Sequence, residues 1–178
     1  MSIYTASVGP DSLKVAETLL NIGVDSIASR KFATAEGEIE RALDTLRRID
    51  GPDSSTTALG EYRLATAFAG EGKYDEAESA LRHALPVLEK TWPGGHFAVA
   101  DCLLEMAEVE RLRRQYASAE LLYQKAIAMY EKCGVPGRSG LAVSLQQYAK
   151  LLRTGRNDEA KALEKRAQEL QKSVHAFR

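Results

Sequence analysis

Three carboxylates stand at helical spacing in the middle of the chain, at Asp101, Glu105 and Glu108. Separations of four and seven residues place side chains on one face of a helix, so these carboxylates would form one acidic stripe. Such a stripe favours a ligand that carries Lys or Arg. The alternatives are a solvated helix face, or carboxylates that pair with Arg63 or Arg111. Paired carboxylates alone do not indicate acid–base catalysis, because they are common on charged helices.

No other residue pattern predicts catalysis or a bound metal. His83, His96 and His175 share no ligand spacing with one another or with the cysteines, and they are typical of surface or loop histidines. Cys102 and Cys133 lack a Cys-x-x-Cys pattern, which predicts two reduced thiols in a cytoplasmic protein. We therefore expect no enzyme activity, no cofactor and no metal.

The charge balance argues against a nucleic-acid or membrane partner. The 178 residues include 24 Lys and Arg against 25 Asp and Glu, a formal net charge of -1. No uncharged run approaches the roughly 20 residues that span a bilayer, and the first residues lack the pattern of a signal peptide. A basic edge would allow only a weak nucleic-acid contact, because no aromatic residues interleave its arginines, Arg111, Arg113, Arg114, Arg153 and Arg156.

The elements that position these side chains follow a repeat of 42 residues. The segment GPDS at 9–12 returns at 51–54, and KFATAEGEIERAL from residue 31 aligns with KYDEAESALRHAL from 73 and QYASAELLYQKAI from 115. A fourth copy, RNDEAKALEKRA, follows from residue 156. Each copy carries two alanines seven residues apart on one helical face, where a small side chain lets a neighbouring helix approach closely. These pairs are Ala35 and Ala42, Ala77 and Ala84, Ala119 and Ala126, and Ala160 and Ala167.

Each repeat has the pattern of a helix A, a tight turn, a helix B and a loop with Gly and Pro. A single helical hairpin cannot bury its apolar face, so the copies must stack. We predict one all-α domain over residues 9–174, with repeats at about 9–50, 51–92, 93–134 and 135–174. The last repeat, whose second helix is densely charged, is predicted to be a C-terminal cap. Residues 1–8 and 175–178 are a short leading segment and a tail.

The second repeat, ALGEYRLATAFAGEGKYDEAESALRHAL from residue 58, resembles the tetratricopeptide repeat, above all in its GKYDEA string at 72–77. The 42-residue period is similar to the kinesin light chain subclass of that family. The resemblance implies a right-handed α-solenoid of about four helix-turn-helix repeats. Glu61 and Glu110 depart from the family pattern, because they stand where it prefers bulky side chains, and Asn157 replaces the aromatic residue of the turn.

The resemblance implies a protein-binding adaptor or scaffold that holds a peptide or helix in a concave groove lined by the A helices. The groove positions that it implies are Asn21, Tyr62, Arg63, Thr66, Leu104, Glu105, Glu108, Gln146 and Lys150. Binding of a chaperone's C-terminal carboxylate is not expected. Asp101 and Glu105 stand where the family's carboxylate clamp requires cations, and they would repel that group.

A second class of function remains open from the sequence. The first repeat has no preceding cap, so it would be available to dock on another copy of the chain. The alternative to an adaptor is therefore a self-assembling structural protein, a homo-oligomer, or a regulatory subunit of a larger complex.

Overall fold

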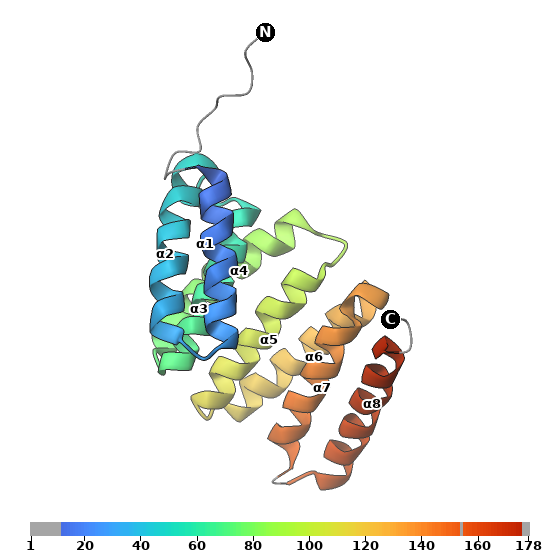
Figure 1. Cartoon of the computed structure of the whole chain (residues 1–178). Helices are drawn as coiled ribbons and strands as arrows, with labels where there is room; N and C mark the ends of the chain where they lie inside the picture. Colours follow the sequence, from blue (N-terminus) through green and yellow to red (C-terminus); the bar gives the residue numbers. More distant parts are fainter. Residues whose placement is uncertain (1–11, 154, 176–178) are drawn as a thin grey trace. The chain divides into compact units, whose positions relative to one another are not determined.

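The computed structural model describes residues 12–153 and 155–175, and the secondary structure of these residues is helical throughout. The chain forms two compact units, unit 1 within residues 1–87 and unit 2 within residues 88–178. Figure 1 shows the helices in chain order. Their bounds are α1 Leu13–Ala28, α2 Phe32–Ile49, α3 Ser55–Glu71, α4 Tyr74–Thr91, α5 Phe97–Leu112, α6 Tyr116–Cys133, the short 3-10 helix η1 Val135–Gly137, α7 Arg138–Leu152 and α8 Asn157–His175.

Unit 1 contains the helical hairpin α1–α2, then α3, and α4 as far as Val87. Helix α2 packs against both α1 and α3, and the two A helices α1 and α3 also touch. Its core joins Ala35, Ile39 and Leu43 of α2 to Leu64 of α3, with Leu20 of α1 packed at the side. Helices α1, α2 and α3 therefore bury apolar side chains against one another.

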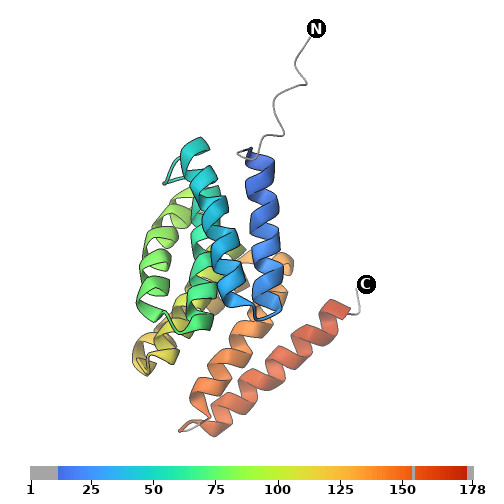
Figure 2. The same ribbon diagram turned by 60° about the vertical axis from the view of Figure 1, so that its left-hand side comes forward.

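Unit 2 contains the hairpins α5–α6 and α7–α8, and α7 also packs against both α5 and α6. Figure 2 shows the antiparallel pair α7–α8 from a second side. Two buried tyrosines, Tyr123 of α6 and Tyr148 of α7, stack with their ring centroids 5.7 Å apart. They join the small residues Ala107, Ala119 and Ala149 in one core cluster.

Small residues form the seams between helices, as the sequence predicts. The alanines of the four pairs are buried, with exposed fractions of 0% or 1%. On α1, which packs against α2, a Cβ added to Gly23 would lie 2.5 Å from Cγ1 of Ile39 on α2. The prediction of close helix approach at these positions is confirmed.

The tight turns of the first three repeats share one unusual backbone conformation. Arg30, Gly72 and Arg114, spaced 42 residues apart, have φ values of 58°, 81° and 64°. This left-handed region is favourable for glycine and costs other residues free energy. The repeat therefore preserves the turn geometry at two positions where the sequence does not supply a glycine.

The predicted all-α class and helix-turn-helix repeats are confirmed. The helix pairs lie in the four predicted repeat ranges, except that α8 runs to His175, one residue beyond the predicted end. Residues 1–11 and 176–178, which include the leading segment and most of the tail, lie outside the described residues. The single domain over 9–174 stays a prediction, because the chain divides into two compact units.

Candidate protein-binding surfaces

The A-helix face of unit 1 carries a surface hollow of about 280 Å³ between α1 and α3. We call it the α1–α3 hollow. Asn21 and Arg63, two of the predicted groove residues, line it. Arg63 is half-buried, and its Nε is buried without a hydrogen-bond partner. The other lining residues are Glu17, Leu20, Leu46, Thr56 and Leu59.

The other two predicted groove residues of unit 1, Tyr62 and Thr66, are half-buried on α3. The Thr66 hydroxyl donates to the backbone carbonyl of Tyr62 at 3.2 Å. Thr66 therefore offers a partner its methyl group and the acceptor capacity of its hydroxyl oxygen, rather than an unused donor.

In unit 2 the acidic stripe of α5 is bound internally at both ends. Asp101 accepts a hydrogen bond from the hydroxyl of Tyr130. Glu108 accepts one from the hydroxyl of Tyr123 and a second from Arg111 Nη2, at 2.8 Å. Because both tyrosines are buried on α6, these carboxylates satisfy hydrogen-bond donors of the core. These contacts favour the structural alternative over a Lys- or Arg-bearing ligand.

The remaining predicted residues of unit 2 lie on α5 and α7. Leu104 is half-buried and packs against the core of unit 2, and Glu105 is half-buried one residue further along α5. Gln146 and Lys150 line a hollow of about 260 Å³ between α7 and α8, with Arg153, Glu164 and Gln168. The Lys150 ammonium donates to the side-chain oxygen of Gln147 at 3.0 Å.

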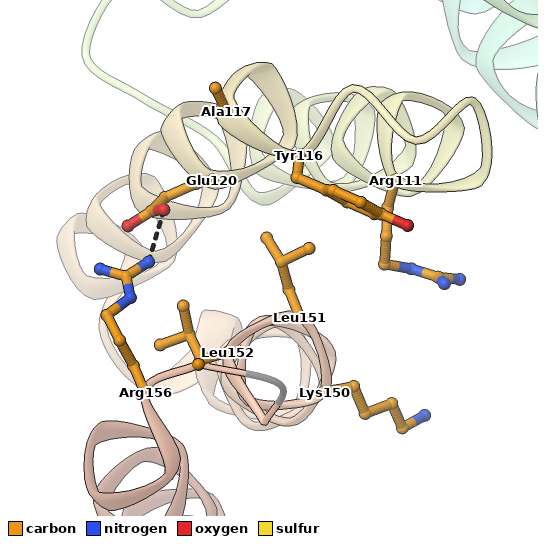
Figure 3. Close-up of a pocket in the computed structure, with 9 residues that line it drawn as sticks. Arg111, Tyr116, Ala117, Glu120, Lys150, Leu151, Leu152 and Arg156 are labelled. Carbon is orange, nitrogen blue, oxygen red and sulfur yellow. Dashed lines mark hydrogen bonds and ion pairs between the residues drawn. The ribbon is translucent and has the colours of Figure 1, made fainter.

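A larger open hollow, of about 670 Å³, lies at the turn between α5 and α6, beside the end of α7 (Figure 3). We call it the turn hollow. Tyr116, Leu151 and Leu152 provide apolar walls, and Arg111, Lys150 and Arg156 provide cations. Glu120, the one carboxylate among its described lining residues, binds Arg156 Nη2 at 2.5 Å and accepts from the Tyr148 hydroxyl at 2.7 Å. The Arg156 and Tyr148 hydrogen bonds lower the pKa of Glu120. Ala117 and Gly155 complete the lining.

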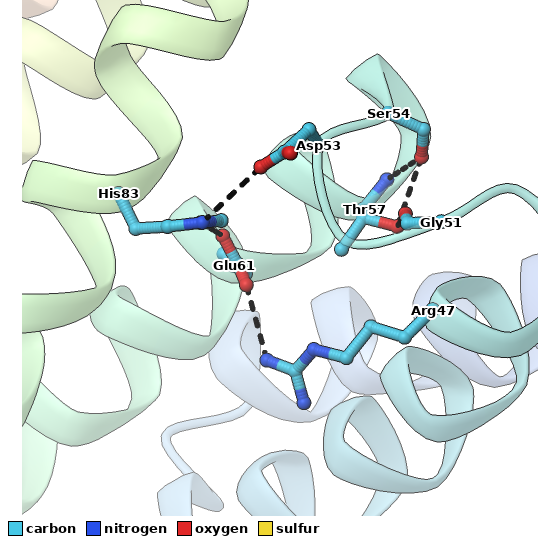
Figure 4. Close-up of polar contacts among 7 residues, drawn as sticks. All are labelled: Arg47, Gly51, Asp53, Ser54, Thr57, Glu61 and His83. Atoms are coloured by element: carbon cyan, nitrogen blue, oxygen red, sulfur yellow. Dashed lines mark hydrogen bonds and ion pairs between the residues drawn. The ribbon is translucent and has the colours of Figure 1, made fainter.

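A polar cluster in unit 1 explains the departure at Glu61 (Figure 4). Glu61 is 5% exposed, and its carboxylate contacts Arg47 Nη2 at 3.0 Å and His83 Nδ1 at 2.5 Å. The second ring nitrogen of His83 lies 3.7 Å from Asp53. The cluster links α2, α3 and α4 to the loop before α3, so His83 is a structural residue rather than an ordinary surface histidine. Sequence reasoning identified Glu61 as unusual but found none of its partners.

The cysteines are both thiols. Burial, with help from nearby carboxylates, raises the pKa of Cys102 to about 12, so this thiol is a poor nucleophile. Within the described ranges no group of three His, Cys, Asp or Glu is placed to hold a metal ion. None of the described helices combines the length and the hydropathy that a membrane crossing requires.

The family of the chain follows from its sequence and its repeated hairpins. The tetratricopeptide repeat model matches residues 14–90 and 56–132, which together cover more than half of the chain. The chain belongs to the tetratricopeptide repeat family, a class of helical-repeat folds that generally bind other proteins. No curated protein sequence matches the chain.

Solved structures share this fold. The chain is similar to BtubC (BKLC) from P. vanneervenii, with a TM-score of 0.78 at 15% identity over 98% of this chain and 69% of that one. It is similar to aspartyl phosphate phosphatase F from Bacillus subtilis, with a TM-score of 0.77 at 14% identity over 92% of this chain and 42% of that one. The tetratricopeptide-like repeats of a putative kinesin light chain from Podospora anserina give 0.69 at 16% identity over 98% and 82%. The α-solenoid fold and the likeness to kinesin light chain repeats are confirmed.

Proposed function

We propose that the chain is a non-catalytic adaptor or scaffold that binds another protein, as a peptide or a helix, on the exposed faces of α1, α3, α5 and α7. Membership of the tetratricopeptide repeat family supports this role. The proposed contact residues are those implied by the sequence, with Asn21 and Arg63 central in unit 1 and Leu104, Gln146 and Lys150 in unit 2. A cytoplasmic location belongs to the same proposal, and the two thiols support it.

The observation that carries the proposal is Arg63 in the α1–α3 hollow. A guanidinium group is always charged and carries five donors in a fixed plane. The Nε atom of Arg63 is buried without an acceptor, so no hydrogen bond at that atom fixes the guanidinium group. Because Arg63 lines the hollow beside Asn21, a backbone carbonyl or a carboxylate of a partner placed there would bind its guanidinium group. Arg63 is thus built to recognise a polar group of a bound chain.

The test compares two arginine variants as baits in the lysate of the source cell, with captured proteins quantified by mass spectrometry. Arg63→Ala removes the buried donor, and Arg41→Ala, on the exposed face of α2, is the matched control. We expect one or a few proteins that the wild type and Arg41→Ala retain and that Arg63→Ala loses by about tenfold, as for an arginine at an interface centre. Circular dichroism checks that both variants keep the helical content of the wild type.

Equal capture by Arg63→Ala and the wild type would contradict the proposal for this face. If the baits retain only further copies of the chain, the homo-oligomer alternative is supported, and sedimentation at several concentrations would then give a mass above 19.5 kDa. Glu108 is not a suitable test position. Its replacement would leave the buried Tyr123 hydroxyl without its acceptor and disturb the core.

A further inference from the structure

The turn hollow of unit 2 exposes an aromatic ring that its counterpart in unit 1 does not. Tyr116 is the aromatic residue that follows the α5–α6 turn, and it is 55% exposed. Phe32 holds the equivalent place in the first repeat and is half-buried. A Cβ added to Gly70, near the end of α3, would overlap the Phe32 ring, so α3 lies directly against it. The side chain of Tyr116 is therefore more exposed than that of Phe32.

Helix α7, which lies beside Tyr116, ends early in its repeat. Helix α3 ends at Glu71, and two periods of 42 residues after Glu71 is residue 155. Helix α7 ends at Leu152, three residues before that position. Within the described residues, α7 is therefore shorter at this end than α3. The hollow of about 670 Å³ lies at this place and has the size of a typical ligand site.

The walls of the hollow define what it can hold. Tyr116 and Leu151 present apolar surface to its interior, while Arg111 and Lys150 extend along the same side of it (Figure 3). Among the described residues, the lining carries three cations against one carboxylate. Glu120 offsets Arg156, and Glu108 offsets Arg111, whereas the Lys150 ammonium donates to the neutral side chain of Gln147. The hollow is therefore net positive around an apolar floor.

We propose that the turn hollow receives an acidic segment of a partner protein, with an apolar side chain of that segment between Tyr116 and Leu151. Carboxylates beside that side chain lie against Lys150 and Arg111. The proposal rests on the proposed adaptor function and names the chemistry of the partner at this place. The apolar walls favour a peptide over a nucleic acid, because the floor of the hollow suits an apolar side chain.

The test uses three synthetic peptides with blocked ends and the ¹⁵N-labelled full chain. The first carries one Phe flanked by two Glu on each side, the second has Ala in place of Phe, and the third has Lys in place of Glu. Amide chemical shifts locate and quantify binding. We expect only the first to bind measurably, with Kd on the order of 0.1–1 mM. The shifts should lie at the start of α6 and the end of α7.

Two pairs of variants test the contributions of Tyr116 and Lys150 to peptide binding. Tyr116→Ala should lower the affinity for the first peptide by about tenfold. Leu121→Ala, which removes a 61% exposed side chain from the same helix, should leave that affinity unchanged. Lys150→Glu should abolish binding, whereas Lys125→Glu, at an exposed site on α6, should reduce it by no more than about twofold through long-range charge. Circular dichroism shows whether each variant is folded.

Several outcomes overturn the proposal. These are equal affinity for the Lys peptide, shifts outside the turn hollow, no loss in Tyr116→Ala, or tighter binding of a single-stranded oligonucleotide at the same residues. Arg63→Ala should not change peptide binding. If the first peptide does not bind while partner capture depends on Arg63, the turn-hollow proposal is wrong and the adaptor proposal stands. If the peptide binds as expected while Arg63→Ala captures partners as well as the wild type does, the proposal for the α1–α3 hollow is wrong and that for the turn hollow stands.

Discussion

Glu61 shows how one ionisable side chain is accommodated inside a helical repeat. A buried carboxylate is costly unless it is paired, and Glu61 is paired by Arg47 and His83. The two partners are 44% and 46% exposed in their side chains, whereas the side chain of Glu61 is 7% exposed. The carboxylate is therefore buried, whereas its two partners are reached by water. Substituting the partners should thus change the stability differently from substituting Glu61.

The first prediction uses this asymmetry. Arg47→Ala combined with His83→Ala leaves the Glu61 carboxylate buried and unpaired, and should lower the free energy of unfolding by about 3 kcal/mol. Glu61→Leu places an apolar side chain at this position and leaves Arg47 and His83, which water can reach, so its stability should lie within about 1 kcal/mol of wild type. Urea unfolding followed by circular dichroism measures both. Equal losses in the two variants would contradict this prediction.

The second prediction concerns the turn at Arg114. Its φ of 64° is strained for an L-residue, at about 1–2 kcal/mol, and glycine removes that strain. Glycine also raises the entropy of the unfolded chain, so we expect Arg114→Gly to gain about 0.5–1 kcal/mol. Arg114→Ala removes the same charge while keeping the strain, and should gain nothing. Thermal melting of the two variants measures the change in stability. An equal gain in stability in both variants would mean that the loss of the Arg114 charge, rather than relief of strain, causes it.

The residue scale is also where sequence reasoning was least complete. Glu61 was recognised as a departure because the repeat sets an expectation at that position. Its partners Arg47 and His83 were not, because they lie 14 and 22 residues away on other helices, and no local spacing connects them. The same holds for Asp101 and Glu108. Their spacing predicted a shared face, but only the fold shows that buried tyrosines of α6 bind them.

At the scale of elements, the small residues of the seams set how closely helices pack. The third prediction compares two alanines of α6. Ala126 is 0% exposed, so Ala126→Leu must force side chains apart and should cost about 1–3 kcal/mol. Ala128 is exposed on the same helix, and Ala128→Leu should change the unfolding free energy by less than about 0.5 kcal/mol. Similar losses at both positions would contradict the role given to the seam.

Glu120 connects three elements, since it lies on α6 and binds Tyr148 of α7 and Arg156 just before α8. The Arg156 contact first, and then Tyr148, lowers its pKa in the folded chain. A lowered folded pKa contributes stability above the ordinary titration range of glutamate, and that stability is lost as the pH falls through the folded pKa.

The fourth prediction follows from that sign. The stability of the wild type should decrease from neutral to acid pH more steeply than that of Glu120→Gln, which has no carboxyl group to titrate. Urea unfolding of both proteins across this pH range gives the difference. Parallel curves would mean that Glu120 contributes no proton-linked stability. Glu159→Gln, at an exposed position near Arg156, serves as the control for a general loss of one carboxylate.

The elements themselves were largely predictable, because a period of 42 residues repeats the same helix, turn and small-residue pattern. The early end of α7 was not. The fourth copy is one residue short, which indicates an irregular repeat, but sequence spacing does not say which helix shortens. The turn hollow, with its exposed Tyr116, lies beside that end, and the sequence does not predict it.

At the scale of the whole molecule, the described helices differ in how many neighbours they have. Helix α6 packs against both α5 and α7, while α8 packs chiefly against α7 and buries Ala160 and Ala167. In a repeat protein, a helix with fewer packed neighbours has fewer stabilising interfaces. The fifth prediction is that backbone amides of α8 exchange with solvent by opening at lower free energy than those of α6. Amide exchange measured by NMR gives the opening free energies of both helices. Equal protection of α8 and α6 would contradict the prediction and indicate a single cooperative opening of unit 2.

The stacked pair Tyr123 and Tyr148 also has an optical consequence. Burial, then a bond to a carboxylate, raises the pKa of both phenols in the folded chain, through Glu108 for Tyr123 and Glu120 for Tyr148. A phenolate absorbs at longer wavelength in the near ultraviolet than a phenol does. Both rings lie in unit 2, so their late ionisation in an alkaline titration would record the opening of that unit by absorbance alone. The chain thus carries its own unlabelled probe for the half that contains the turn hollow.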